Sequence, residues 1–251
     1  MPNLSSASVV LSVVIPVFRC APCLQPLYER LSATLCTVGK PWEIIFVNDA
    51  SPDESAAMLD RMASADPRVV VVNLPTNHGQ FFAIATGLAE CRGDYAIVMD
   101  GDLEHPPEAI PKFLSEALSG HEIVLGICSR RTRSLLRWLA SRLFRRFVAP
   151  YRHFPNHHDY GAISVLSRRV RRQFLSHSDT HCAYLGILDR LSMPYKLVSY
   201  ESEPRPAGKS SYNVLSLLRS AHSIAGSSRK NRPSNPRTLR LPVGVGAGNR
   251  D

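Results

Sequence analysis

Short apolar runs alternate with helical patterns along the first half of the chain. The apolar runs span Val9–Pro16, Trp42–Val47, Val69–Leu74, Tyr95–Met99 and Glu122–Ile127. The helical patterns between them span Pro22–Val38, Asp53–Ala65, Gln80–Cys91 and Pro107–Leu118. Such alternation is typical of βαβ units, and near-continuous apolar strands are typical of a parallel sheet that is buried on both faces. The sequence therefore predicts an α/β fold in which helices cover both faces of a mostly parallel central sheet.

Length and composition are those of one globular domain. The chain has 251 residues, of which 44% are hydrophobic and 20% are charged, and this balance disfavours disorder except at the ends. No apolar run approaches the roughly 18 residues needed to cross a bilayer. Val9–Val17 is short and lacks the basic leader and the cleavage site of a signal peptide. We therefore expect a cytoplasmic protein.

The 6 cysteines are scattered mainly through predicted strands and helices. In a chain without a signal peptide, reduced thiols are expected. Cys20 and Cys23 have the spacing of a redox pair, but no second pair supplies zinc ligands. We therefore expect neither a redox role nor a zinc site.

Charge is unevenly distributed along the chain. Residues 1–127 carry 7 basic and 15 acidic side chains, whereas residues 128–172 carry 12 basic side chains and the single acid Asp159. No zinc finger or aromatic RNA-binding signature accompanies the basic segment, which argues against a nucleic-acid partner. A phosphate-bearing ligand or an anionic membrane surface fits better.

The fourth apolar run ends in an acidic loop. Asp100 and Asp102 flank Gly101, which lets the backbone bend tightly, and such a carboxylate pair suits Mg²⁺ or Mn²⁺ held together with substrate phosphates. The alternative is a solvated acidic turn before a helix. That alternative is less favoured because Pro106-Pro107 begins a helical segment directly after the loop, which fixes the direction in which the chain leaves it. We interpret His105 as a structural partner of the loop rather than a base.

Polar segments follow the first four strands at the edge where parallel sheets bind ligands. They are Pro16–Arg19, Asn48–Asp53, Asn77–Gln80 and the acidic loop. In the second segment, Ser51 or Asp53 could simply cap the next helix. Alternatively, an acid there could accept hydrogen bonds from a nucleotide. No Gly-x-Gly-x-x-Gly and no Walker lysine loop follows the first strand, which disfavours a dinucleotide dehydrogenase or a P-loop NTPase.

Four segments resemble the family 2 glycosyltransferases of the GT-A fold, and within them the bacterial undecaprenyl-phosphate and dolichyl-phosphate sugar transferases. They are Val14–Phe18, Val47–Asp53, Asn77–Gln80 together with Asp100–Glu108, and Arg205–Tyr212. The resemblance extends from about Leu11 to Ser223. It implies a three-layer, nucleotide-binding GT-A domain over residues 9–225, with the donor and metal half at 9–127 and the acceptor and membrane-facing half at 128–225. Residues 1–8 are then a flexible N-terminus, and the Pro-, Gly- and Arg-rich residues 226–251 a disordered basic tail.

The resemblance also implies roles for single residues. Donor-binding residues would be Pro16, Phe18, Asp49, Gln80, Asp100, Ser210 and Tyr212. Catalytic residues would be Asp100, Asp102 and Arg205, and metal ligands Asp100, Asp102 and Glu104. Residues for the acceptor phosphate would be Arg131, Arg137 and Ser141. The chain departs from the family pattern at Phe18-Arg19-Cys20, Asn48 and Glu104, which bears on donor identity and metal preference.

The reaction implied is metal-dependent transfer of a sugar from a nucleotide-diphosphate sugar to a polyprenyl phosphate, for cell-envelope glycan or lipopolysaccharide synthesis. The resemblance favours a UDP-linked donor. A phosphate monoester has a second pKa near 6, so its oxygen is already largely anionic near neutral pH. It could attack the anomeric carbon directly, with inversion.

Leu135–Val148 fits an interfacial helix or equally a core helix. The absence of transmembrane helices leads us to expect peripheral attachment to the inner face of the cytoplasmic membrane; homo-oligomer formation stays open.

Two rival hypotheses remain at this point. A soluble glycosyltransferase could extend a saccharide hydroxyl, which would need a carboxylate base such as Asp159 or Glu104. Alternatively, the chain could be a degenerate nucleotide-sugar-binding scaffold. The intact acidic loop and Arg205 argue against degeneracy, and the acceptor-side arginines argue for an anionic acceptor.

Overall fold

A computed structural model describes residues 11–130, 160–177 and 184–203, all within one compact unit of the chain. Its centre is a seven-stranded sheet with the order β3-β2-β1-β4-β6-β5-β7. The strands are β1 (Leu11–Val17), β2 (Trp42–Asn48), β3 (Val69–Asn73), β4 (Tyr95–Val98), β5 (Ile123–Arg130), β6 (Tyr160–Ser167) and β7 (Lys196–Glu201). The helices are α1 (Ala21–Val38), α2 (Ser55–Ala65), α3 (Gln80–Glu90), the 3-10 turn η1 (Pro107–Ala109), α4 (Ile110–Leu118), α6 (Arg168–Ser176) and α7 (Tyr184–Arg190).

The sheet is mostly parallel, as predicted. β1 pairs in parallel with both β2 and β4, and β3 pairs in parallel with β2. β6 runs antiparallel to β4 and β5, while β7 returns parallel to β5. The carboxyl ends of β1 to β4 therefore meet at one edge of the sheet.

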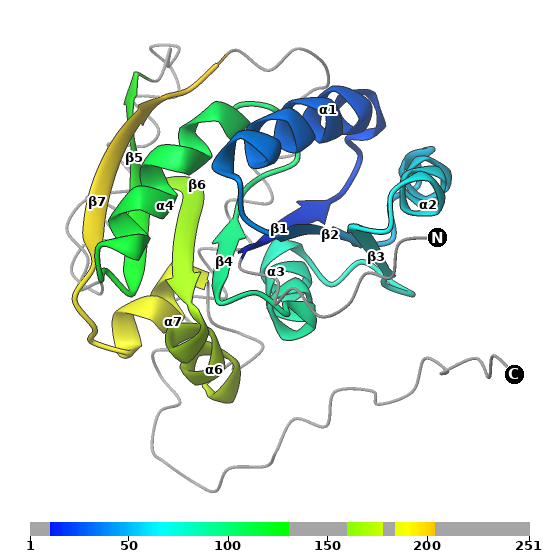
Figure 1. Cartoon of the computed structure of the whole chain (residues 1–251). Coiled ribbons are helices and arrows are strands. Elements are labelled where there is room, and N and C mark those ends of the chain that lie inside the picture. Colours follow the sequence, from blue (N-terminus) through cyan, green and yellow to red (C-terminus); the bar gives the residue numbers. More distant parts are fainter. Residues whose placement is uncertain (1–10, 131–159, 178–183, 204–251) are drawn as a thin grey trace, which may run out of the picture. The chain divides into compact units, whose positions relative to one another are not determined.

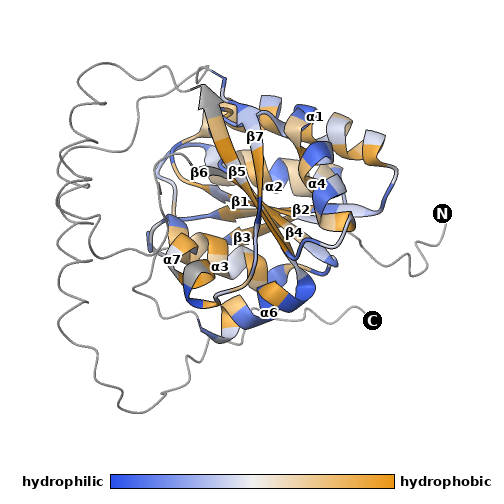
Figure 2. Cartoon of the chain, turned by 90° about the vertical axis from the view of Figure 1, so that its left-hand side faces the viewer, coloured by the Kyte–Doolittle hydropathy of each residue, from blue (hydrophilic) through white to orange (hydrophobic). Residues whose placement is uncertain are grey.

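Helices cover both faces of the sheet (Figure 1). One core cluster packs α1, α2 and α4 against one face, and a second packs α3, α6 and α7 against the other. Neighbouring residues of a strand point to opposite faces, so Val13 and Ile15 join the first cluster and Val14 joins the second. Figure 2 shows the central strands in the hydrophobic colours and hydrophilic stretches on the helices. The predicted three-layer α/β/α arrangement is confirmed.

The predicted strands and helices of residues 11–127 all form, with small shifts at their ends. The pattern expected at Pro107–Leu118 is split into η1 and α4, and Pro111, which has no N–H to donate, lies in the first turn of α4. The helix expected at Leu135–Val148, the N-terminus 1–8 and the tail 226–251 lie outside the described residues. None of the helices in the described part of the chain is both long and apolar enough to span a membrane.

Asp66 joins three elements of the first core cluster. It ends α2, and its buried carboxylate accepts hydrogen bonds from the Tyr28 hydroxyl on α1 and from the Arg68 guanidinium that leads into β3. The Arg68 guanidinium lies 3.9 Å from the centroid of the Trp42 ring. Burial alone would raise the pKa of Asp66, but the hydrogen bonds from Arg68 and Tyr28 outweigh it and lower the pKa.

We expect Asp66→Asn to lower the free energy of unfolding by about 1–3 kcal/mol at neutral pH, because charge-assisted hydrogen bonds are lost. The lowered pKa makes this contribution fully present above the unfolded-state pKa of about 3.9 and lost as pH falls through the folded-state value. Urea denaturation at pH 7 and at pH 3 measures the difference. Asp60→Asn, at an exposed position of the same helix, is the control. A difference from wild type that stays constant between the two pH values would contradict this account.

Candidate functional site

The loops after β1 to β4 are linked to one another at the carboxyl edge, as predicted from the sequence. The amide of Arg19, after β1, donates to the Ser51 hydroxyl after β2. Gln80, the first residue of α3, donates its side-chain amide to Asp100 after β4. The Asp49 carboxylate after β2 accepts the amides of His78 and Gly79 after β3, so hydrogen bonds connect the polar segments of all four strands.

Backbone geometry at this edge includes left-handed non-glycine residues. Arg19, Ala50 and Leu103 have φ values of 55°, 51° and 61°, a conformation that costs energy in residues with a Cβ and that often occurs at functional sites. Leu103 lies in the acidic loop, buried at 4% exposure. Gly101 and Asp102 form a turn, as predicted, and the left-handed residue of the loop is Leu103. Gly101 also serves close packing, because a Cβ there would lie 3.2 Å from Ile15 Cγ2.

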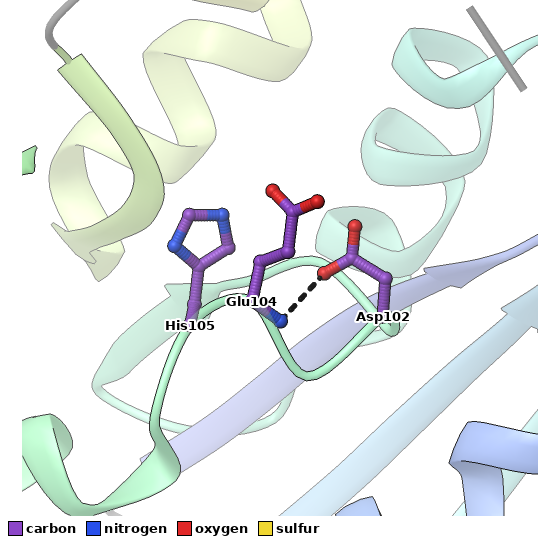
Figure 3. Close-up of side chains that lie close together, drawn as sticks. All are labelled: Asp102, Glu104 and His105. Atoms are coloured by element: carbon purple, nitrogen blue, oxygen red, sulfur yellow. Dashed lines mark hydrogen bonds between the residues drawn. The ribbon is translucent and has the colours of Figure 1, made fainter. Parts of the chain in front are cut away.

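The acidic loop brings a candidate metal site together. Asp102, Glu104 and His105 each offer a ligand atom, and these atoms lie within 4.8 Å of one another (Figure 3). The amide of Glu104 donates to Asp102 Oδ1 at 3.0 Å, which fixes the carboxylate. Asp102 and Glu104 are partly exposed, whereas His105 is buried. Two accessible carboxylates on one loop fit a hard divalent cation.

Asp100 lies beside this cluster rather than within it. Its Oδ1 accepts from Gln80, and its Oδ2 is 3.7 Å from Nε2 of His105. The structure groups Asp102 with Glu104 and His105, and the convergence of Asp100 and Asp102 on one point stays a prediction. The interpretation of His105 as a partner of the acidic loop fits this contact, and a role of Asp100 as a metal ligand stays a prediction.

Asp49 is 2% exposed and holds the loop that leads into α3. Its two carboxylate oxygens accept the amides of His78 at 2.7 Å and Gly79 at 2.8 Å, and its carbonyl accepts from Asn77. The carboxylate thereby satisfies two backbone donors just before the helix. Sequence reasoning assigned Asp49 to the nucleoside, and it did not foresee this anchoring of the Asn77–Gly79 loop.

The capping alternative weighed for the second loop is partly correct. Asp53 accepts the amide of Ser55, the first residue of α2, and also the amide of Ala21, the first residue of α1. Burial alone would raise the pKa of Asp53, but the hydrogen bonds from Ser55 and Ala21 hold it lower than usual. Ser51 instead contacts Arg19, while its own amide donates to Asn48 Oδ1.

Cys20 and Cys23 pack beneath the acidic loop. The Cys23 thiol donates to the carbonyl oxygen of Asp102 at 3.9 Å, and the Cys20 Sγ lies 3.5 Å from the position of a Cβ at Gly101. Burial raises the pKa of Cys20 to about 12. These thiols therefore serve as small packing groups under the loop.

Distant elements brace the acidic loop, and sequence reasoning missed them. Arg30 on α1 forms ion pairs with Glu108 at 2.6 Å and with Glu203, just after β7, at 2.8 Å. The amide of Glu203 donates to the carbonyl of Glu104, and the Tyr200 hydroxyl on β7 lies 2.6 Å from Nδ1 of His105. Nothing in the local sequence pattern signals these contacts, because the partners are about 80 to 170 residues apart.

The remaining predicted residues fall into two groups. Pro16 and Phe18 are partly exposed at the end of β1, close to the second strand's loop, since the amide of Asp49 donates to the Val17 carbonyl. The second group lies outside the part of the chain that the structure describes and comprises Arg131, Arg137, Ser141, Arg205, Ser210 and Tyr212. The described residues at this edge are therefore those to which the resemblance assigns donor and metal binding, and these roles stay predictions.

Comparison with known sequences identifies relatives of this chain. The family model described as "Glycosyl transferase family 2" matches residues 12–175. An undecaprenyl-phosphate 4-deoxy-4-formamido-L-arabinose transferase from Pectobacterium carotovorum is 35% identical over 82% of this chain and 64% of its own length. The transferase of the same name from Pseudomonas aeruginosa is 38% identical over 83% of this chain and 62% of its own. The chain thus spans less than two thirds of the length of either relative.

Solved structures share the fold. A glucosyl-3-phosphoglycerate synthase from Mycobacterium tuberculosis, in complex with Mn²⁺, UDP-glucose and glycerol 3-phosphate, aligns with a TM-score of 0.61 at 20% identity, over 89% of this chain and 80% of that one. A mannosyltransferase from Pyrobaculum calidifontis, in complex with GDP-Man and Mn²⁺, aligns with a TM-score of 0.60 at 16% identity, over 89% and 65%. The predicted GT-A fold is confirmed. Because the family model matches more than half of this chain, the chain belongs to glycosyl transferase family 2.

Proposed function

We propose that this chain transfers a sugar from a nucleotide-diphosphate sugar to a polyprenyl phosphate such as undecaprenyl phosphate. The observation that carries the proposal is the proximity of the Asp102 and Glu104 carboxylates at the carboxyl edge of a family 2 domain. Relatives at 35% and 38% identity are named as undecaprenyl-phosphate sugar transferases. Synthesis of a cell-envelope glycan or lipopolysaccharide is the corresponding role.

The donor would bind along the carboxyl edge. Pro16 and Phe18 would line the base pocket, and Gln80 and Asp100 would face the diphosphate. We favour a UDP-linked sugar on the family resemblance. Ser210 and Tyr212 are proposed to fix the segment that carries Arg205.

Asp102 and Glu104 would hold Mn²⁺ or Mg²⁺, with Asp100 next to them. Bound there, a divalent cation supplies positive charge to the departing nucleotide diphosphate. The partial exposure of Asp102 and Glu104 leaves their carboxylates accessible from solvent. These metal ligands, which are mainly carboxylate oxygens, suit such a hard ion.

The acceptor needs little activation. The phosphate oxygen of a polyprenyl phosphate is largely anionic near neutral pH, so it attacks the anomeric carbon as the bond to the nucleotide diphosphate breaks, with inversion. Arg205 would stabilise the charge that develops on the leaving group. Arg131, Arg137 and Ser141 would hold the acceptor phosphate, at the cytoplasmic face of the membrane.

The direct test is transfer from a panel of radiolabelled nucleotide sugars to undecaprenyl phosphate, with Mn²⁺ or Mg²⁺ and an EDTA control. We expect metal-dependent label in the lipid extract from one donor, and the UDP-linked sugars to be the active class. Label in a saccharide but not in lipid would favour a soluble glycosyltransferase instead. Binding of a nucleotide sugar without either transfer or hydrolysis would favour a scaffold protein.

We expect Asp102→Asn and Arg205→Ala each to reduce transfer by about 100-fold or more. Arg205→Ala removes positive charge that stabilises the leaving group, and Asp102→Asn weakens the binding of the cation that does the same. Binding of the lipid acceptor should be unchanged in both variants. Asp60→Asn, on the exposed side of α2, is the control for loss of one carboxylate. Full turnover in either site variant would contradict the assigned roles.

Asp49→Asn should loosen the Asn77–Gly79 loop, because an amide side chain retains only one acceptor oxygen for the two amides of His78 and Gly79. We expect a loss of about 1–3 kcal/mol in the free energy of unfolding. Hydrogen–deuterium exchange at His78 and Gly79 should be faster, and the KM for the donor should rise. Asp53→Asn removes an acceptor of two other amides and should leave this exchange unchanged.

A further inference from the structure

Tyr200 is a buried residue of β7 whose hydroxyl reaches the acidic loop from 95 residues away in sequence. The hydroxyl lies 2.6 Å from Nδ1 of His105, which is itself 3% exposed. The two rings meet edge to face with centroids 5.4 Å apart. This contact links the last described strand to the candidate metal site.

The Tyr200 ring is held in a closely fitted position. The Phe113 ring of α4 packs against it edge to face at 6.0 Å. On the neighbouring strand, a Cβ at Gly126 would come within 2.7 Å of Tyr200 Cε1. The ring thus occupies space that a side chain on β5 would fill, and this packing leaves the hydroxyl little room to move away from His105.

The other nitrogen of His105 faces Asp100. Nε2 lies 3.7 Å from Asp100 Oδ2, and a carboxylate is stabilised by an N–H rather than by a lone pair. A neutral imidazole carries one hydrogen, so Nδ1 then accepts the hydrogen of the Tyr200 hydroxyl. A single tautomer satisfies both contacts, with the hydroxyl as donor at Nδ1 and Nε2–H directed at Asp100.

This tautomer decides what His105 can do beside Asp102 and Glu104. A ring nitrogen binds a metal ion only through its lone pair, and here one lone pair accepts a hydrogen bond while the other nitrogen carries a hydrogen. Mg²⁺ and Mn²⁺ bind preferentially to oxygen ligands, whereas an imidazole ligand shifts the preference of a site toward ions such as Zn²⁺. The orientation of His105 therefore bears on metal selectivity.

We propose that Tyr200 is a positioning residue that holds His105 toward Asp100 and so keeps the imidazole out of the metal's ligand set. The cation is then left to carboxylate oxygens, chiefly those of Asp102 and Glu104. This proposal rests on the proposed function, because it requires that the acidic loop bind a divalent cation.

Tyr200→Phe removes only the hydroxyl and keeps the packed ring, so it tests the proposal directly. The experiment titrates Mn²⁺ and Zn²⁺ separately into the full chain, with and without UDP, following free Mn²⁺ by electron paramagnetic resonance and Zn²⁺ by calorimetry. We expect the ratio of the Mn²⁺ Kd to the Zn²⁺ Kd to rise about tenfold, because the released imidazole can then bind Zn²⁺. Changes to residues that surround a metal site commonly alter metal affinity by this amount. General loosening of the loop would weaken both ions and leave this ratio unchanged.

Two further variants keep the result interpretable. Tyr184→Phe is the matched control, since Tyr184 is also buried and its hydroxyl contacts Ser164 at 2.8 Å in the second core cluster. It should leave the ratio unchanged. Adding His105→Asn to Tyr200→Phe should abolish the gain in relative Zn²⁺ affinity, which would assign the gain to the imidazole rather than to a cysteine elsewhere.

The outcomes separate this proposal from the proposed function. Wild-type protein that binds no Mn²⁺, with or without UDP, would overturn both. Wild-type protein that binds Mn²⁺, together with a Tyr200→Phe ratio within about threefold of wild type, would overturn the role of Tyr200 alone. A gain in relative Zn²⁺ affinity that persists in the double variant would also overturn it.

Discussion

Parallel pairing of β1 with both β2 and β4 is the constraint on which the site depends. Parallel strands end at the same edge, so the loops after β1, β2, β3 and β4 lie together although they are spread over more than 80 residues. The faces of the sheet are buried by helices, which leaves this edge open for polar side chains. Hydrogen bonds between loops, such as that from Gln80 to Asp100, then give the edge a defined geometry.

Two kinds of support maintain the acidic loop. Local support comes from the left-handed backbone at Leu103 and the amide of Glu104, which fix the Asp102 carboxylate. Long-range support comes from Arg30, which pairs with Glu108 just after the loop and with Glu203 after β7, and from the Tyr200–His105 contact. Because a metal site demands ligand positions within a few tenths of an ångström, supports of this kind are as much a part of the site as its carboxylates.

The elements of residues 11–127 could be predicted because each is encoded locally. Apolar runs such as Trp42–Val47 and helical patterns such as Gln80–Cys91 carry their own periodicity, and strand ends carry the polar segments. The turn at Gly101 was predicted correctly but its close packing was not, because a glycine can serve backbone freedom, close packing or both, and sequence does not distinguish these. Ile15 and Cys20, whose side chains lie against the position that a Cβ of Gly101 would occupy, come from other segments of the chain.

By itself the sequence determined the layered α/β fold, the edge at which the site lies and the carboxylates that face it, because periodicity and strand-end motifs are properties of short segments. Tertiary structure alone decided that Asp49 anchors the Asn77–Gly79 loop and that Tyr200 and Arg30 reach the acidic loop. These are contacts between residues up to 173 positions apart. Sheet register and helix packing bring these residues together in space, and no local sequence pattern predicts contacts between residues so far apart in the chain.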